Sequence, residues 1–474
     1  MASDHADAPE PPIALLAPGQ LIDGFRVQAL LHQGGMAQLW RVVAVDSDEA
    51  LPLIMKVPRT GTGDDPAAIV GFEVEQMILP ALSGPHVPRF VARSGLGQRP
   101  YIVMERIDGP SLLPRLEAAP LPLAEVVDIG ARVATALHDL HRQRLVHLDV
   151  KPSNIMFRAD GSAVLVDYGL SRHDRLPDLL EEEFRLPLGT GPYMSPEQVL
   201  GIRNDPRSDL FALGVMLYHF TTGARPFGAP DNVRGLRQRL YRAPLPPRAL
   251  RPDCPPWLQE VLLCCLEVRP GLRWQSAAQL ALALQNPEQI VLTERAQRIG
   301  RGGWLQPLWR RWMGAAAGPA MDGAAGVASQ LMRSPIIVAA VDVELGTEAL
   351  LEQLRESVRR TVAAEPGARL ACISVHTAGR GGADDQSRHA RLLIELKHWA
   401  RPLAQALDFG EGRLTFHVLE ASDPAAALVE FAQRNQVDHI VMGARGRSAL
   451  RRYLGSVSSQ VVAQAPCTVT VVRI

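Results

Sequence analysis

Strand-like and helix-like segments alternate without interruption from Ser334 to the end of the chain, and this regularity constrains the fold more than any other feature of the sequence. Apolar runs such as IIVAAVDV, LACISVH and LTFHVLEA are each followed by a segment with helical periodicity. Because parallel strands need long crossover connections, five strands alternating with four helices predict a doubly wound, parallel α/β sheet. The helices are expected at residues 347–364, around 389–407, at 423–436 and at 457–464.

The earlier part of the chain has a different pattern, which is β-rich at first and mainly helical afterwards. Short β-branched runs between turn signals predict strands over residues 21–106, with one helix from Pro66 to about Leu82. From Leu112 onward, apolar residues recur at helical spacing. The sequence therefore predicts one domain at residues 21–285, in which a small β-rich half (21–106) precedes a larger helical half (107–285).

Two further segments lack either pattern. Residues 1–20 are rich in Ala, Pro and Asp and are expected to form a disordered tail. Residues 286–333 form a Gly-rich linker to the domain at 334–474, with a basic cluster around Trp304, Trp309 and Trp312. Two interpretations of the cluster are open: a strap that packs its tryptophans on a neighbouring domain, or a contact site for a membrane surface or a partner.

Composition narrows the function classes. Lys+Arg and Asp+Glu both number 50, so the formal net charge is zero and a basic surface for nucleic acid is not expected. No apolar run approaches the ~18–20 residues of a membrane helix, and the N-terminus lacks the pattern of a secretion signal. The five cysteines have no paired metal spacing. We therefore expect a cytoplasmic protein with reduced thiols and no transmembrane segment.

A short motif, HLDVKPSN, occupies residues 147–154 and combines the side chains that phosphoryl transfer needs. In such a loop Asp149 would accept or orient the proton of a substrate hydroxyl, Lys151 would neutralise the transferring phosphoryl group, and Asn154 would hold a magnesium ion. A second motif, VLVDYGL, ends an apolar strand at Asp167, which would be the second magnesium ligand. Because the two aspartates are 18 residues apart and occur in this order, the motifs together are a much stronger signal than either alone.

Lysine is rare in this chain, and its positions are therefore informative. Lys56, Lys151 and Lys397 are the three lysines, so nearly all the positive charge comes from arginine. Lys56 lies in the strand-like run LPLIMKV, and the helix that follows offers Glu73 and Glu75. A lysine that holds the α- and β-phosphates of a nucleotide needs a carboxylate to fix it. Two of the three lysines thus fall where phosphoryl transfer requires them.

Residues 21–285 resemble a bacterial eukaryotic-type serine/threonine protein kinase over the whole catalytic domain. The resemblance implies the bilobal protein kinase fold (α+β), ATP and Mg²⁺ as cofactors, and a protein substrate with a Ser/Thr acceptor. The adenine pocket is expected at the motif YIVME, with Met104 as gatekeeper and Glu105, Arg106 and Ile107 as the hinge. The remaining matches are Lys56 with its helix partner Glu75, Asp149 as the base, Lys151 as the phosphate lysine, Asn154 and Asp167 as the metal ligands, and Thr190 as the threonine that tethers Asp149 and Lys151.

The resemblance also covers residues that support the catalytic loop. Asp209 in SDLFALG matches the anchor of that loop, and Arg273 matches the arginine that pairs with Glu197. A small-molecule phosphotransferase would share the aspartate and the asparagine of the loop. The pair Lys151-Pro152 and the segment GTGPYMSPE favour a protein substrate instead.

The Gly-rich loop departs from the kinase pattern. LLHQGGMAQLW keeps Gly34 and Gly35, which are expected to bind the phosphates, but it has His32 and Ala37 where LGxGGMGxVY has glycine. A Cβ atom at these two positions limits the conformational freedom of the backbone and its approach to the phosphates. This departure is the reason for considering a pseudokinase.

The activation loop departs as well. Leu148 stands where many kinases have an arginine whose charge is compensated by a phosphate on that loop. The middle of the loop carries Asp178, Glu181, Glu182 and Glu183. Either these carboxylates pair with nearby arginines and hold the loop, or they form a solvated acidic stretch. We expect activity that does not depend on loop phosphorylation, with control passed to the linker and the C-terminal domain.

The segment GARGRSALRRYLGS follows the fourth strand of the alternating region and has the glycines and the hydroxyl of an anion-binding loop. Residues 334–474 resemble the universal stress protein family, although the second spacing of the loop holds eight residues rather than nine. A nucleotide site and a purely structural loop both remain open. The residues that match the adenine-side aspartate and the phosphate loop are Asp342, Gly443, Gly446, Gly455 and Ser456.

The final strand, TVTVVRI, has no helix after it, and an exposed strand edge is a template for pairing with another chain. We therefore expect a homodimer through the C-terminal domain, as the resemblance also implies. Three functions compete at this point. They are an active serine/threonine kinase with a regulatory, nucleotide-binding stress-protein module, a pseudokinase scaffold, and a protein that chiefly senses nucleotides.

Overall fold

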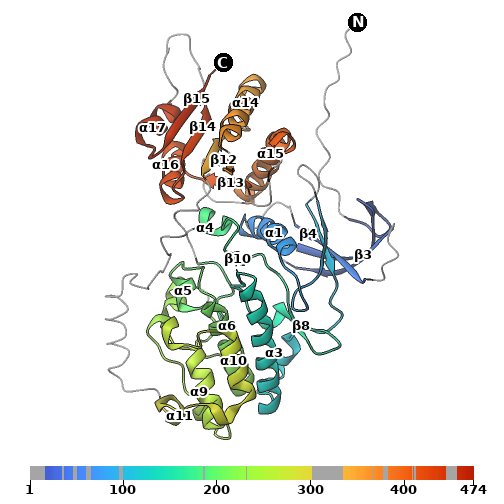
Figure 1. Ribbon diagram of the computed structural model, residues 1–474, viewed down its shortest axis with the longest axis vertical. Helices are drawn as coiled ribbons and strands as arrows, with labels where there is room; N and C mark the ends of the chain where they lie inside the picture. The colour runs from blue at the N-terminus through green and yellow to red at the C-terminus, as the bar shows by residue number, and fades with distance from the viewer. Residues whose placement is uncertain are drawn as a thin grey trace.

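The computed structural model divides into a small lobe, a helical lobe and a C-terminal α/β domain (Figure 1). In Figure 1 the C-terminal domain lies above the small lobe, with the helical lobe below. The described residues are 16–34, 37–45, 51–59, 66–94, 100–184, 187–230, 232–300, 335–365, 367–376, 383–407, 409, 413–444 and 456–473.

The N-lobe is an antiparallel sheet with one helix on it. The order of its six strands is β1-β2-β3-β4-β6-β5. Their bounds are β1 Leu21–Ile22, β2 Phe25–Gln33, β3 Ala37–Ala44, β4 Leu53–Pro58, β5 Phe90–Arg93 and β6 Ile102–Glu105. Trp40, Met55 and Val103 fill the core on one face of the sheet. Helix α1, Pro66–Ile78, ends four residues earlier than expected because Pro80 cannot donate a helical hydrogen bond, and a 3₁₀ turn (Leu79–Ala81) follows.

The C-lobe is built on four long helices, and its short strands carry the catalytic loop. The helices are α3 Leu123–Arg142, α6 Arg207–Thr222, α9 Pro256–Cys265 and α10 Ala277–Gln285. The strands are β7 Leu145–Val146, β8 Ile155–Phe157, β9 Ala163–Leu165 and β10 Arg172–His173. The shorter helices are α2 Leu113–Glu117, α4 Leu179–Glu183, α5 Pro196–Val199, α7 Val233–Leu236, α8 Pro247–Leu250 and α11 Glu294–Gln297. The buried residues of α3 share one face, as its periodicity predicts.

The ordered C-lobe extends past residue 285, where the sequence suggested a linker. Helix α11 packs against α9, and Ala296 is fully buried. The Gln259 amide donates to the main-chain oxygens of Arg295 and Arg298. The buried Gln259 side chain needs hydrogen-bond partners. Its bonds fix the main chain at residues 295–298, which the sequence had assigned to the linker. The tryptophans at 304, 309 and 312 lie outside the described residues.

The expected tail is likewise ordered at its end. Leu16 is buried in the N-lobe core, and Gly19 donates its N–H to the Val27 oxygen. Residues 1–15 lie outside the described part of the chain. The tail that the sequence predicted at residues 1–20 therefore overlaps the folded N-lobe at its last five residues.

The C-terminal domain confirms the doubly wound prediction. Its five strands are all parallel, in the order β13-β12-β11-β14-β15. The strands are β11 Ile336–Ala340, β12 Arg369–His376, β13 Leu414–Glu420, β14 His439–Gly443 and β15 Thr468–Val472. Helices α14 (Glu348–Ala364) and α15 (Ala383–Leu407) cover one face of the sheet, and α16 (Pro424–Arg434) and α17 (Ser456–Gln464) cover the other.

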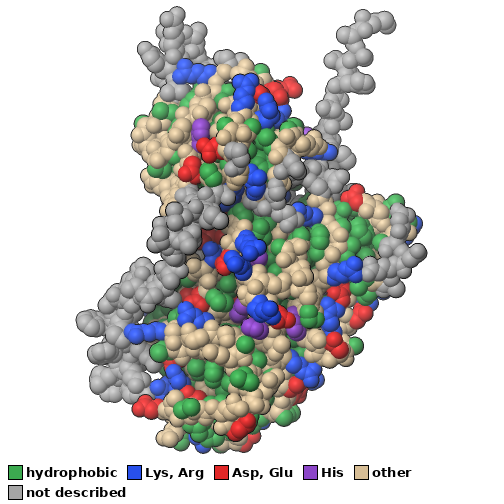
Figure 2. All heavy atoms as spheres, in the orientation of Figure 1, with side chains coloured by type: hydrophobic (Ala, Val, Ile, Leu, Met, Phe, Trp, Pro, Cys, Tyr) green, Lys and Arg blue, Asp and Glu red, His purple; other side chains and the backbone are tan. Residues whose placement is uncertain are grey.

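Charges of both signs are mixed over the surface. On the face drawn in Figure 2, lysine and arginine side chains lie among aspartates and glutamates over both domains. Within the described residues, no helix is long and apolar enough to cross a membrane. The five cysteines are free thiols.

Candidate active site

Lys56, Glu75 and Asp167 come from three separate elements and meet in one ion-paired group. Lys56 lies on β4, Glu75 on α1, and Asp167 follows β9. Lys56 pairs with the carboxylate of Glu75, and its Nζ donates to Asp167 Oδ1 at 2.8 Å. The main-chain φ of Asp167 is +69°, which turns its carboxylate toward the lysine. The sequence expectation that Glu75, and not Glu73, is the partner of Lys56 is thus met by the geometry.

The electrostatics of this group favour the charged forms of Lys56 and Asp167, whereas burial raises the pKa of Glu75 against the opposing influence of Lys56. Burial opposes the charge on Lys56, but the carboxylates of Asp167 and Glu75 outweigh it and raise the lysine pKa. The positive charge of Lys56 lowers the pKa of Asp167 to about 2. Asp167 is therefore ionised at neutral pH, and Lys56 stays protonated.

The catalytic-loop residues form a second group around one hydroxyl. Thr190 Oγ1 accepts a hydrogen bond from Lys151 Nζ at 2.9 Å and donates to Asp149 Oδ1 at 2.7 Å. Lys151 Nζ also lies 2.6 Å from Asp149 Oδ2. Asn154 Nδ2 donates to the same carboxylate oxygen at 3.0 Å. Asp149, Lys151, Asn154 and Thr190 are thus brought together. The positive charge of Lys151 also contributes to the lowered pKa of Asp167.

A buried aspartate on α6 holds the catalytic loop. Asp209 is fully buried and accepts hydrogen bonds from the main-chain N–H groups of His147 and Leu148 at 2.9 and 2.8 Å. His141 Nε2 lies 2.9 Å from the same carboxylate. Leu148 has φ +62° and is itself buried, so it is held by packing where the resembling kinases have an arginine.

The substrate-side segment is anchored by a second buried pair. Arg273 donates two hydrogen bonds to the Glu197 carboxylate, at 2.6 and 2.7 Å, and both side chains are buried. The guanidinium also lies 5.0 Å from the centre of the Phe211 ring. The bidentate geometry fixes α5 to the segment at Arg273, whose Nη1 also donates to the Arg207 oxygen at the start of α6 at 2.9 Å. This pair is the one that the resemblance implied.

The expected nucleotide-binding residues are placed only in part. Gly34 donates its N–H to the Ala37 oxygen at the tip of the β2–β3 hairpin, and Gly35 lies outside the described residues. Met104 is buried at the end of β6. The Glu105 side chain makes an ion pair with Arg158, and its N–H donates to the Arg89 oxygen at 2.9 Å, so neither is left for the adenine contact that was expected there. Ile107 is buried just beyond the strand.

Two glycines make close contact between α1 and the turn after Asp167: Gly169 belongs to the motif VLVDYGL, whereas Gly71 was not singled out from the sequence. A Cβ atom built on Gly71 of α1 would lie 3.0 Å from the main-chain oxygen of Gly169, and one on Gly169 would lie 3.1 Å from the oxygen of Gly71. Without side chains, α1 and the DYG turn lie directly against each other. A glycine inside an otherwise apolar helix was the available signal.

The polar residues at this site fit magnesium and nucleotide phosphates. The Asp167 side chain is 44% exposed, and its low pKa leaves it ionised. The amide nitrogen of Asn154 is engaged by Asp149, which turns its Oδ1 outward to accept from Ser153 at 3.1 Å. Mg²⁺ prefers oxygen ligands, and it is usually held by one or two protein ligands together with substrate phosphates. Among the described residues no cluster of three or more His, Cys, Asp or Glu forms a separate metal site.

The candidate site of the C-terminal domain is only partly described. Asp342 follows β11, and Gly443 ends the neighbouring strand β14, so both lie where the strand order reverses. Asp342 Oδ1 accepts from the Leu345 N–H at 3.0 Å. A Cβ atom on Gly443 would lie 3.1 Å from Leu350, so this glycine also serves packing. Gly446 and Gly455 and the Ser456 side chain lie outside the described residues.

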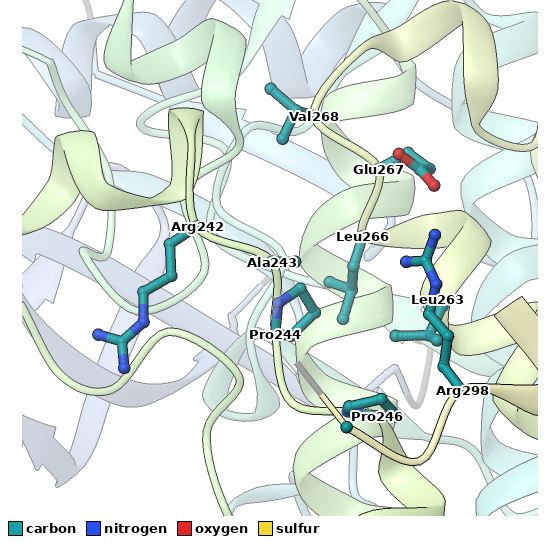
Figure 3. A pocket seen from close by; sticks show the side chains of 10 residues that line it. Arg242, Ala243, Pro244, Pro246, Leu263, Leu266, Glu267, Val268 and Arg298 are labelled. Carbon is teal, nitrogen blue, oxygen red and sulfur yellow. The ribbon is translucent and has the colours of Figure 1, made fainter. Parts of the chain in front are cut away.

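A small pocket in the C-lobe lies away from these groups. It is lined by residues that include Pro244 and Pro246, Leu263 of α9, Leu266 and Arg298 (Figure 3). Its volume of about 20 Å³ leaves room for little more than a water molecule. It is not the site of phosphoryl transfer.

Two lobes that join a lysine–glutamate pair to a loop with catalytic aspartate, lysine and asparagine define a protein kinase. Residues 28–284 match the family described as "Protein kinase domain", and the chain belongs to that family. Residues 333–473 match the universal stress protein family. The chain is therefore a kinase domain followed by a universal stress protein domain.

Mycobacterial kinases are among the curated proteins that this chain is similar to. The chain is 32% identical over 267 residues to the serine/threonine-protein kinase PknA of Mycobacterium tuberculosis, covering 55% of this chain and 60% of PknA. It is 31% identical over 273 residues to PknB of Mycobacterium leprae, covering 56% of this chain and 43% of PknB. The chain thus aligns with less than two thirds of either relative. A solved kinase domain of M. tuberculosis PknI matches with a TM-score of 0.44 and 25% identity, over 58% of this chain and 100% of that one.

Proposed function

We propose that this chain is an active serine/threonine protein kinase that transfers the γ-phosphoryl group of ATP to a protein hydroxyl. The observation that carries the proposal is the Thr190 hydroxyl, which bridges Lys151 and Asp149. This bridge forms while Lys56 is already paired with Glu75 and Asp167. A chain that had lost catalysis would have no chemical need to keep both polar groups assembled.

Each residue has a role in the proposed reaction. Asp149 orients the acceptor hydroxyl and takes its proton, and Lys151 faces the transferring phosphoryl group. Lys56 holds the α- and β-phosphates under the hairpin that carries Gly34 and Gly35, with the adenine near Met104 and the hinge at residues 105–107. Asn154 and Asp167 would hold Mg²⁺, which would neutralise charge on the phosphates. Glu75 fixes the position of the Lys56 side chain through their ion pair.

We propose a kinase domain at 21–285 whose folded structure includes the flanking residues 16–20 and 286–298, a linker in the remainder of 286–333, and the stress-protein domain at 334–474. The protein is proposed to be cytoplasmic and to act on protein substrates. The C-terminal domain is proposed to regulate the kinase and to bind a nucleotide between Asp342 and the loop at 443–456. Equilibrium dialysis with labelled ATP tests the second site. We expect two nucleotides per chain, and one in Asp342→Ala; a single nucleotide in both would contradict it.

We also propose a homodimer through β15. This strand lies at one end of the sheet, and its side chains are largely half-buried rather than exposed. An unpaired edge of this kind can add a strand from a second copy. Light scattering of the full chain at micromolar concentration tests this, and a mass that corresponds to a monomer alone would contradict the proposal.

Transfer of label from γ-labelled ATP to a generic protein substrate tests the kinase activity. Wild type is compared with Asp149→Asn, which keeps the size of the side chain but removes its negative charge. Circular dichroism controls for folding of the variant. Transfer by wild type and not by the variant supports the proposal. Equal background in both, with nucleotide binding retained, would make the chain a pseudokinase.

A further inference from the structure

Helix α1 lies between the active site and the C-terminal domain. Glu75 points to Lys56, whereas Glu73 makes an ion pair with Lys397 on α15. Residues two apart on a helix lie on roughly opposite faces. Ile69, one turn before Glu73 and on its face, is buried in the core that α14 and α15 form on the sheet of the C-terminal domain. The domain thus contacts the outer face of the helix whose inner face carries the catalytic glutamate.

The second contact is made by the activation loop. Helix α4 lies against both α1 and β13 (Figure 1). Glu182 accepts two hydrogen bonds from Arg369 at the start of β12, both at 2.6 Å, and Arg369 also donates to Thr415 at 2.9 Å. Glu183 Oε1 lies 3.0 Å from His417 Nδ1 on β13. Glu182 and Glu183 are therefore covered by basic residues of the C-terminal domain, whereas Asp178 lies 3.6 Å from Arg172, one of the nearby arginines that the sequence suggested as partners.

These contacts are buried and complementary in charge. The Arg369 and Glu182 side chains are 11% and 10% exposed, and Lys397 and Glu73 are 20% and 10% exposed. Burial opposes the charge of Glu182, but its hydrogen bonds with Arg369 outweigh the effect and lower its pKa. Buried pairs add little net stability, but removing one partner leaves a buried charge without compensation. The two ion pairs therefore favour one arrangement of the C-terminal domain against the kinase domain.

The other end of α4 is attached to the C-lobe. Asp178, which caps α4, pairs with Arg203 at 2.8 Å and lies 3.6 Å from Arg172. One short helix thus connects the C-lobe, α1 and the C-terminal domain. The paired Lys56 and Glu75 and the Thr190 bridge are all formed in this docked arrangement.

We infer that Lys397 and Arg369 are positioning residues for the kinase reaction: by pairing with Glu73 and Glu182, they hold α1 and the activation loop where Glu75 meets Lys56. The inference rests on the proposed kinase function. Neither residue touches the reacting groups. They act through α1 and α4, and through the Gly71–Gly169 contact that joins α1 to the turn after Asp167.

A charge-swap experiment on the full chain tests the inference. The variants are Lys397→Glu, Glu73→Lys and the double variant that exchanges the two charges, with Arg391→Glu as the matched control on an exposed position of α15. Each single variant places like charges opposite each other. We expect each to lose about tenfold in kcat/KM, and the double variant to recover most of that loss. Arg391→Glu should stay close to wild type.

Two results would overturn the inference. Unchanged or increased rates in the single variants would show that docking does not support the site. Losses that the double variant fails to recover would show general damage rather than loss of the pair. Amide hydrogen exchange of α1 gives a readout that needs no turnover, and we expect faster exchange in the single variants only. If phosphoryl transfer by wild type is no greater than by Asp149→Asn, the kinase proposal has failed. The hydrogen exchange of α1 still tests whether the Glu73–Lys397 pair holds this helix.

Discussion

Helix α1 carries two glutamates two residues apart, and they form ion pairs in two different parts of the molecule. Glu75 meets Lys56 within the kinase domain, and Glu73 meets Lys397 of the stress-protein domain. The first pair joins residues 19 positions apart, and its partners follow recognisable motifs. The second joins residues from different domains. Nothing in the local sequence of Glu73 distinguishes it from a solvated surface glutamate.

The comparison shows how a catalytic contact and a regulatory contact can share one rigid element. In the proposed reaction the inner contact would supply the chemistry, and the outer contact would fix the position of the helix that carries Glu75. The experiments below test the inner face, the coupling between the two faces, and the contact with the C-terminal domain.

The largest effect is expected from Lys56→Arg on the inner face. A planar guanidinium cannot replace the compact ammonium between Glu75, Asp167 and the phosphates. We expect at least about a hundredfold loss of turnover, with normal circular dichroism and unchanged hydrogen exchange in α4. Rates like those of wild type would remove Lys56 from its proposed role.

Gly71→Val tests whether the two faces communicate through the position of the helix. The Cβ atom would lie 3.0 Å from the Gly169 main-chain oxygen, which cannot rotate away, so α1 and the turn at Gly169 must separate slightly. We expect about a tenfold loss of kcat/KM, smaller in Gly71→Ala. Equal activity of wild type and both variants would contradict a tight requirement for this contact.

The contact between α4 and the C-terminal domain should make the stability of the protein depend on pH through Glu183. Burial first, and then the nearby charges of Glu73 and Glu182, raise its pKa from 4.5 to about 7, against the opposing influence of His417. Because the folded state holds this proton more tightly, its contribution to stability is present below about pH 4.5 and is lost as the pH rises to about 7.

Glu183→Gln removes this dependence. We expect the free energy of unfolding of the variant to exceed that of wild type by about 1–3 kcal/mol at pH 8 and to differ little from it at pH 4.5. Thermal melts at the two pH values measure the difference, with Glu181→Gln, on the exposed side of α4, as the control. A gain that is the same at both pH values would exclude Glu183 as the titrating group.

The smallest effect is expected from removing phosphate groups from the activation loop. Glu182 and Glu183 already occupy the partners on the C-terminal domain, Leu148 stands in place of an arginine, and the buried Arg203 is already paired with Asp178. Phosphatase treatment, with mass spectrometry to confirm a bare loop, should change initial rates by less than about twofold. A large loss that returns on rephosphorylation of the loop would contradict this.

Much of the active site follows from sequence because its geometry is local. Asp149, Lys151 and Asn154 lie within one six-residue stretch, so a single loop aims them at the same point. The alternation after residue 334 likewise implies parallel strands, since only crossover helices can connect them. By contrast, strand β5 was not anticipated, and the side chain of Glu105 turns to Arg158.

The sequence by itself determined the two domains, the parallel sheet and the residues that meet around Lys56 and Asp149. Tertiary structure alone decided that the acidic activation loop pairs with Arg369 and His417, and that the third lysine pairs with Glu73. The rarity of lysine drew attention to Lys397 without assigning it a partner. The physical reason is that a motif encodes distances along the chain, whereas an ion pair between domains depends on how two finished surfaces meet.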